Sequence, residues 1–194
     1  NYNPANEILW LDYGRDNYAG VTWSNAPNNR RIFLGWMSNW DYAQKVPTEK
    51  WRSAMTLPRE LSLKQTEKEL RLLQNPVKET KKLRETQFLS VKNYELSKEL
   101  SVGDGKSSLV EMELEIDLSK TQAKDFGFEL SNSKGETYKI SYNIALNKFY
   151  SDRTNSGKKD FTDNFAVKKH FAPRMSNKNR LKLHLFFDKA SAEM

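Results

Sequence analysis

A strict alternation of apolar and acidic residues is the strongest constraint on the fold of this 194-residue sequence. In "LVEMELEIDL", residues 109–118, every second residue is apolar and the residues between them are acidic. Successive side chains of a β-strand point to opposite faces, so this pattern predicts a strand with one buried face and one wet acidic face. The same alternation recurs in "DFGFEL", "TYKISYNI" and "RLKLHLFF", with turn signals such as "SNSKGE" between them. Short strands separated by turns predict an antiparallel β-sandwich.

The distribution of tryptophan sets the beginning of the chain apart. All five Trp residues fall within the first 51 positions, more than a small core usually requires. This region reads as four apolar runs, "EILWLDY", "YAGVTWS", "RIFLGWMSNW" and "WRSAMTLPRELSL", with the turn "NAPNNR" between the second and third and an edge or bulge at Pro58. Four such runs make one four-stranded sheet, which cannot bury both faces alone. The region is therefore predicted to be one unit of a repeated assembly, such as a β-propeller blade.

A charged stretch over residues 64–86 is predicted to join the two regions, with a short linking helix at "PVKETKKLRE". The chain has no cysteine, which excludes disulfides, thiolate metal sites and thiol catalysis. Its two histidines, His170 and His184, lie on different segments, and His184 is expected on the outer side of its strand. Neighbouring acidic residues of 111–117 lie about 7 Å apart on one strand face, too far for one metal ion to bind all of them. A solvated acidic surface is therefore expected. No metal site and no cofactor are expected.

Charge and hydropathy limit the expected partners. The net charge is +7, and residues 153–194 carry about +6 of it. That basic stretch is interrupted by acids and lacks any helix-turn-helix, RNP or zinc-finger pattern, so we expect no nucleic-acid partner. No apolar run approaches the roughly 20 residues of a membrane span, and no export signal is visible at the start.

The first region resembles glycoside hydrolase family 32, the levanases, exo-inulinases and invertases. The resemblance rests on "LDYGRDNYAGVTWSN", "RRIFLGWMSNWDYAQKVPTEKWRSAMTLPRELSL" and "LRLLQNPVKE", and extends more weakly to "LKLHLFFDKASAEM". It implies an all-β fold, with one four-stranded antiparallel blade of a five-bladed propeller followed by an antiparallel β-sandwich. Residues 1–78 would form the last blade and linker, and residues 79–194 the sandwich, truncated at its end.

The resemblance implies a secreted retaining hydrolase of β-fructosidic bonds, whose catalytic acids lie in motifs upstream of this chain. No "WMNDPNG"-like nucleophile motif is present, Arg15-Asp16 is followed by Asn17 instead of proline, and the acid/base glutamate normally precedes a cysteine. No catalytic residue is therefore expected here, and the chain is predicted to be inactive alone. The alternative is a carbohydrate-binding β-sandwich module, although residues 88–194 contain no Trp.

The resemblance also implies sugar-binding positions. Carboxylates and amides bind sugar hydroxyls, and Trp covers the apolar sugar face at little entropic cost. The substrate-binding candidates are Asp12, Arg15, Trp36, Asn39 and Trp40. Structural alternatives remain open, since Asp12 has the right position to cap the turn at Gly14, and both Trp residues suit blade packing.

The partners and location follow from the same resemblance. The expected ligand is a fructan or sucrose, and the expected location is extracellular or periplasmic. Exposed blade edges in the isolated chain favour self-association. The sequence does not separate levan from inulin or sucrose, or endo from exo attack.

Overall fold

The computed structural model describes residues 8–66, 69–102, 107–166 and 168–194. Within these residues the secondary structure is β-strands and two short 3-10 helices. The chain forms two compact units, each assembled from separated segments. Within the described residues, unit 1 draws on 8–20, 35–55 and 122–177, and unit 2 on 21–34, 56–121 and 178–194. No helix among the described residues has the length and apolar character to cross a membrane.

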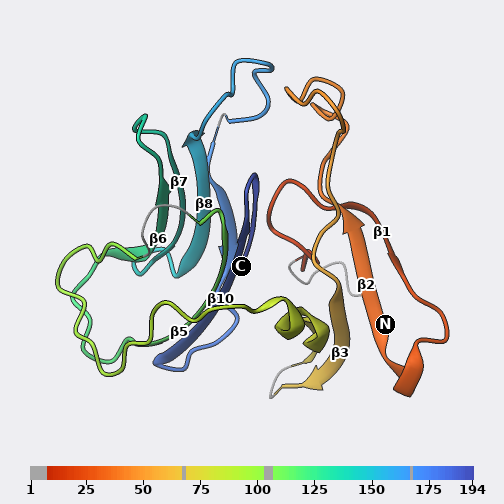
Figure 1. The fold of residues 1–194 in the computed structure, drawn as a ribbon. Helices are drawn as coiled ribbons and strands as arrows, with labels where there is room; N and C mark the ends of the chain where they lie inside the picture. Colours follow the sequence, from red (N-terminus) through yellow and green to blue (C-terminus); the bar gives the residue numbers. More distant parts are fainter. Residues whose placement is uncertain (1–7, 67–68, 103–106, 167) are drawn as a thin grey trace. The chain divides into compact units, whose positions relative to one another are not determined.

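The first sheet has four strands in the order β1-β2-β3-β4, and Figure 1 labels the first three of them. Four is the number of strands that the sequence predicts for this region. Its strands are β1 (Tyr18–Thr22), β2 (Arg31–Trp36), β3 (Arg59–Gln65) and β4 (Leu70–Pro76). The predicted turn before β2 is confirmed, and contains the 3-10 helix η1 (Pro27–Asn29). Asn25, Asn28 and Asn29 have positive φ there, a conformation that Asn tolerates better than most residues.

Two of the predicted strand positions in this region are wrong. Residues 8–13 form no strand, and the fourth strand is instead β4, which pairs with β3 from Arg59↔Pro76 to Gln65↔Leu70. The run that starts at Trp51 becomes a strand only after Pro58, whose carbonyl accepts a hydrogen bond from Val77 N–H. Apolar runs alone did not reveal which segments find a pairing partner. The linking helix is confirmed as the 3-10 helix η2 (Lys78–Leu83).

The second sheet lies entirely in unit 2 and confirms the alternation in the sequence. Its order is β11-β10-β5, with β5 (Leu109–Asp117), β10 (Arg180–Asp188) and β11 (Ser191–Glu193). The strands β5 and β10 pair antiparallel over their whole length. Leu181, Leu183 and Leu185 of β10 are buried, while the residues between them face the acidic row of β5.

The third sheet lies entirely in unit 1, in the order β6-β7-β8-β9. Its strands are β6 (Asp125–Ser131), β7 (Thr137–Asn143), β8 (Lys148–Asn155) and β9 (His170–Pro173). The sequence predicted β6 and β7 but not β8 or β9. Gly127 of β6 has no room for a side chain, because a Cβ there would lie 2.2 Å from the Ile140 carbonyl oxygen.

Each unit draws on residues from both sides of the predicted boundary at 78/79. The division into a blade at 1–78 and a sandwich at 79–194 therefore stays a proposal. Contacts inside unit 1 nevertheless join residues from the two ends of the sequence, and these contacts build the candidate site.

Candidate functional site

All five predicted sugar-binding residues belong to unit 1. Asp12 is half-buried, and its Oδ1 accepts a hydrogen bond from Gly14 N–H at 2.8 Å. Its Oδ2 accepts a second bond from Asn17 Nδ2 at 3.2 Å. Asp12 therefore does cap the turn at Gly14. An ionised carboxylate has about four acceptor positions, so capping the turn and binding a sugar hydroxyl are compatible roles for Asp12.

Three aromatic rings form a series beside β2. Trp36 contacts Trp40 edge-on at 5.0 Å between ring centroids, and Tyr18 contacts Trp36 at 6.2 Å. Trp36 is half-buried, whereas Trp40 is 65% exposed. A large exposed indole held against a second indole offers a rigid apolar surface of the kind that sugar rings pack on.

Arg15 and Asn39 hold protein groups together. Arg15 donates to the Asn164 carbonyl oxygen at 3.0 Å and pairs with Asp41. Asn39 Nδ2 donates to Asp16 Oδ1 at 2.9 Å and to the Arg15 carbonyl oxygen at 3.5 Å. Asn39 Oδ1 accepts from Asp41 N–H at 3.0 Å. The Asn39 side chain thus joins the loop that carries Asp12 to the segment that carries both Trp residues.

Asp16 is the centre of a larger network. Its Oδ2 accepts from Arg153 Nη1 at 2.8 Å, and its Oδ1 accepts from Asn39 and from the Tyr42 hydroxyl. Arg153 Nη2 in turn donates to the Tyr42 oxygen at 2.7 Å. Asp16 thus ties its own loop to Asn39, Tyr42 and Arg153, which is a structural role.

Arg153 is also enclosed by Phe165. Its Nε donates to the Phe165 carbonyl oxygen at 2.6 Å, and its guanidinium lies 4.0 Å from the centroid of that ring. Burial, reinforced by the hydrogen bond to Asp16, raises the pKa of Tyr42 to about 12, so its hydroxyl stays protonated and donates at ordinary pH. Burial, with the nearby Arg153 charge, lowers the pKa of His170, which keeps that imidazole neutral.

The sequence does not point to Tyr42 or Arg153 as part of the site. Arg153 lies 137 residues after Asp16, in strand β8, which the alternation did not predict. The one local signal is an arginine in a segment that also contains aromatic residues, and such segments are common.

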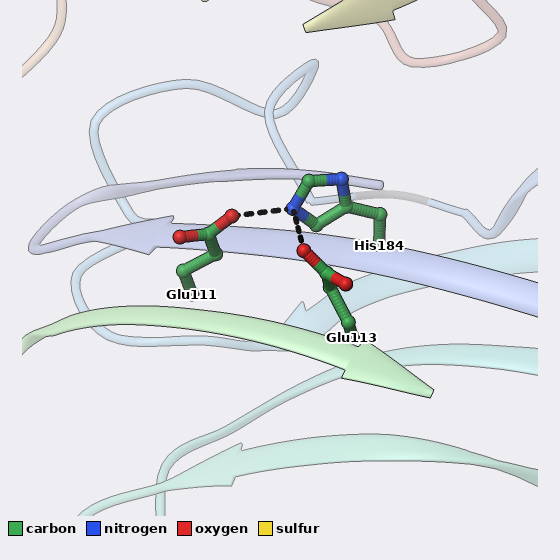
Figure 2. A group of neighbouring side chains, drawn as sticks. All are labelled: Glu111, Glu113 and His184. Carbon is green, nitrogen blue, oxygen red and sulfur yellow. Dashed lines mark hydrogen bonds and ion pairs between the residues drawn. The ribbon is translucent and has the colours of Figure 1, made fainter. Parts of the chain in front are cut away.

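A second group of interacting side chains lies on the β5–β10 sheet of unit 2. Glu111 and Glu113 of β5 and His184 of β10 have donor atoms within 4.8 Å of one another. Figure 2 shows one ring nitrogen of His184 facing both carboxylates. The sequence predicts a solvated acidic face here and does not predict these contacts, because they depend on the pairing of β5 with β10.

Two family models together match almost the whole chain. The model of the glycosyl hydrolases family 32 N-terminal domain matches residues 1–76, and that of the family 32 C-terminal region matches residues 78–194. The chain belongs to glycoside hydrolase family 32. The family resemblance stated from the sequence is thereby confirmed.

The family 32 relatives include enzymes with named activities. The chain is 40% identical to a levanase of Bacillus subtilis (strain 168), over 100% of this chain and 29% of the relative. It is 30% identical to an extracellular exo-inulinase of Aspergillus awamori, over 98% of this chain and 36% of the relative. A crystal structure of the exo-inulinase from that fungus superposes with a TM-score of 0.78 at 27% identity, covering 98% of this chain and 37% of the other. The chain thus spans about a third of these relatives.

Proposed function

We propose that this family 32 chain is the C-terminal part of a longer β-fructosidase acting on levan, inulin or sucrose by a retaining mechanism. In this proposal residues 1–78 form the last propeller blade with its linker, and residues 79–194 form a β-sandwich. The levanase and exo-inulinase relatives, each matched over about a third of its length, support it. The extracellular exo-inulinase also supports an extracellular or periplasmic location.

The observation that carries the proposal is the bridge made by Asn39. The Asn39 side chain binds Asp16 and the Arg15 carbonyl oxygen, which lie in the loop that also carries Asp12. Asn39 itself lies in the segment that carries the paired rings of Trp36 and Trp40. We propose that Asp12 accepts a hydrogen bond from a sugar hydroxyl while the two indoles pack on the sugar. Because Arg15 and Asn39 are bonded to protein groups, their proposed role is to hold these three side chains in place.

The chain is proposed to be inactive alone. A retaining glycosidase needs a nucleophilic carboxylate and an acid/base carboxyl about 5 Å apart. The acids nearest to the candidate site are engaged elsewhere, since Asp16 accepts three hydrogen bonds and Asp41 pairs with Arg15.

Fructose release tests both parts of the proposal. The 194-residue chain and the protein extended upstream to the length of its levanase relatives are incubated with levan, inulin and sucrose. We expect release by the extended protein and none by the chain. Release by the chain would contradict its inactivity, and no release by the extended protein on any of the three sugars would contradict the function.

The sheet β1–β4 is proposed to drive self-association of the isolated chain. Leu63 of β3 and Leu72 of β4 are direct partners in the register, and they are 66% and 50% exposed. Adjacent exposed leucines on one sheet favour burial against another molecule. We expect light scattering to give a mass above one chain, decreasing in a Leu63→Lys, Leu72→Lys variant. A monomer at high concentration would contradict this prediction.

A further inference from the structure

We propose that Glu111, Glu113 and His184 form a binding site for a divalent transition-metal ion of the zinc type. The site lies on the β5–β10 sheet, and its three residues occupy one face of two directly paired strands (Figure 2). His184 is the register partner of Glu113, and Glu111 faces Phe186 two positions further along β10. Strand pairing therefore brings the three side chains together independently of the sugar-binding proposal.

The distances suit a single ion. His184 Nε2 lies 2.7 Å from Glu111 Oε1 and 3.9 Å from Glu113 Oε1. Zinc binds histidine nitrogen and carboxylate oxygen at about 2.0–2.2 Å, so two of its ligand atoms are at most about 4 Å apart. The three ligand atoms all lie within 4.8 Å of one another, so small shifts place them around one ion. The 2.7 Å pair must open slightly, and Glu113 must approach, which its 61% exposed side chain allows.

The donor set favours zinc-like ions over calcium or magnesium. Calcium and magnesium are bound by oxygen atoms, whereas imidazole nitrogen suits zinc, copper and nickel. Three protein ligands leave a fourth position for water, as in open zinc sites. The His184 ring packs on Phe186 at 4.3 Å between ring centroids, which restricts its rotation and keeps Nε2 near the carboxylates.

Arg84 is the competitor for this site. Its Nε donates to Glu111 Oε2 at 2.6 Å, and its Nη2 pairs with both Glu111 and Glu113. The arginine therefore supplies one positive charge to the two carboxylates when no metal ion is bound. A divalent ion supplies two charges and also uses the His184 lone pair, which arginine cannot do. Metal binding requires Arg84 to turn outward, and its 43% exposed side chain has access to solvent.

Zinc titration of the 194-residue chain, followed by calorimetry and native mass spectrometry, tests the site. We expect one zinc ion per chain, and an affinity at least about tenfold lower in His184→Gln and in Glu113→Gln. Arg84→Gln should bind zinc more tightly than the unaltered chain. The matched controls are His170→Gln, which removes the other histidine, and Glu115→Gln, the next glutamate on the same strand face; both should bind as the unaltered chain does.

Two results would overturn the proposal. One is no zinc binding by the unaltered chain when zinc is in excess. The other is equal binding by His184→Gln and the unaltered chain, with the fold of the variant checked by circular dichroism. Glu113 is exposed, so Glu113→Gln should fold normally and keeps the test decisive if His184→Gln does not. The chain has no cysteine and one other histidine, which makes the stoichiometry easy to assign.

Discussion

Replacing Arg153 by methionine is expected to lower the free energy of unfolding of this chain by about 3 kcal/mol. The Arg153 and Asp16 side chains are only 14% and 23% exposed, and Arg153 also donates to Tyr42 and to the Phe165 carbonyl oxygen. Methionine fills much of the same volume but donates no hydrogen bond. The change therefore leaves a half-buried carboxylate without its cation, which costs more than the pair itself contributes.

Thermal unfolding followed by tryptophan fluorescence measures the effect. For a chain of this size, about 3 kcal/mol corresponds to a midpoint lower by roughly 6–12 °C. Arg180→Met is the matched control, because Arg180 pairs with Glu115 at the surface with a 72% exposed side chain, and exposed pairs contribute little. Equal midpoints for the two variants would contradict a stabilising role for the Arg153 network. The double variant Arg153→Met, Asp16→Asn should recover part of the loss, because it removes the unpaired charge.

The sequence predicted the features that depend on neighbouring residues and missed those that depend on residues far apart in the chain. Strands β5, β6, β7 and β10 were predicted because their alternation is a local property of each segment. Strand β8 was missed because Arg153 lies at a half-buried position, where its place depends on Asp16 and Tyr42, more than 100 residues away. Sequence periodicity counts arginine as a surface residue and has no access to such a partner.

The same limit applies to the two candidate sites. Asp12 and Trp36 are candidates because short motifs carry them, and motifs are local; their role in sugar binding stays a prediction. The meeting of Glu111 with His184 depends on the pairing of two strands 73 residues apart, so consideration of the acidic row alone gave a solvated face. The strand predicted at 8–13 does not form, although this segment is apolar and aromatic like the true strands. The segment belongs to none of the three sheets, and the side-chain bonds of Asp12 hold it instead.

Replacing Asp12 is expected to have the largest effect on activity in the extended enzyme. Under the proposed function, Asp12 accepts a hydrogen bond from a sugar hydroxyl, and bonds to charged groups contribute about 1.5–3 kcal/mol. We therefore expect kcat/KM on the preferred fructan to fall roughly 10- to 100-fold in Asp12→Asn. Asparagine keeps a side-chain oxygen for Gly14 N–H, so the turn survives while the negative charge is lost.

The choice of variants separates sugar binding from turn stability. Asp12→Ala removes both the charge and the cap, so it should lower stability as well as kcat/KM, whereas Asp12→Asn should lower kcat/KM at nearly unchanged stability. Asp163→Asn is the matched control, because Asp163 is an exposed aspartate of the same unit and should keep full activity. If Asp12→Asn were fully active while Asp12→Ala only unfolded more easily, the cap at Gly14 would be the whole role of Asp12. The sugar would then be held by Trp36 and Trp40 without this carboxylate.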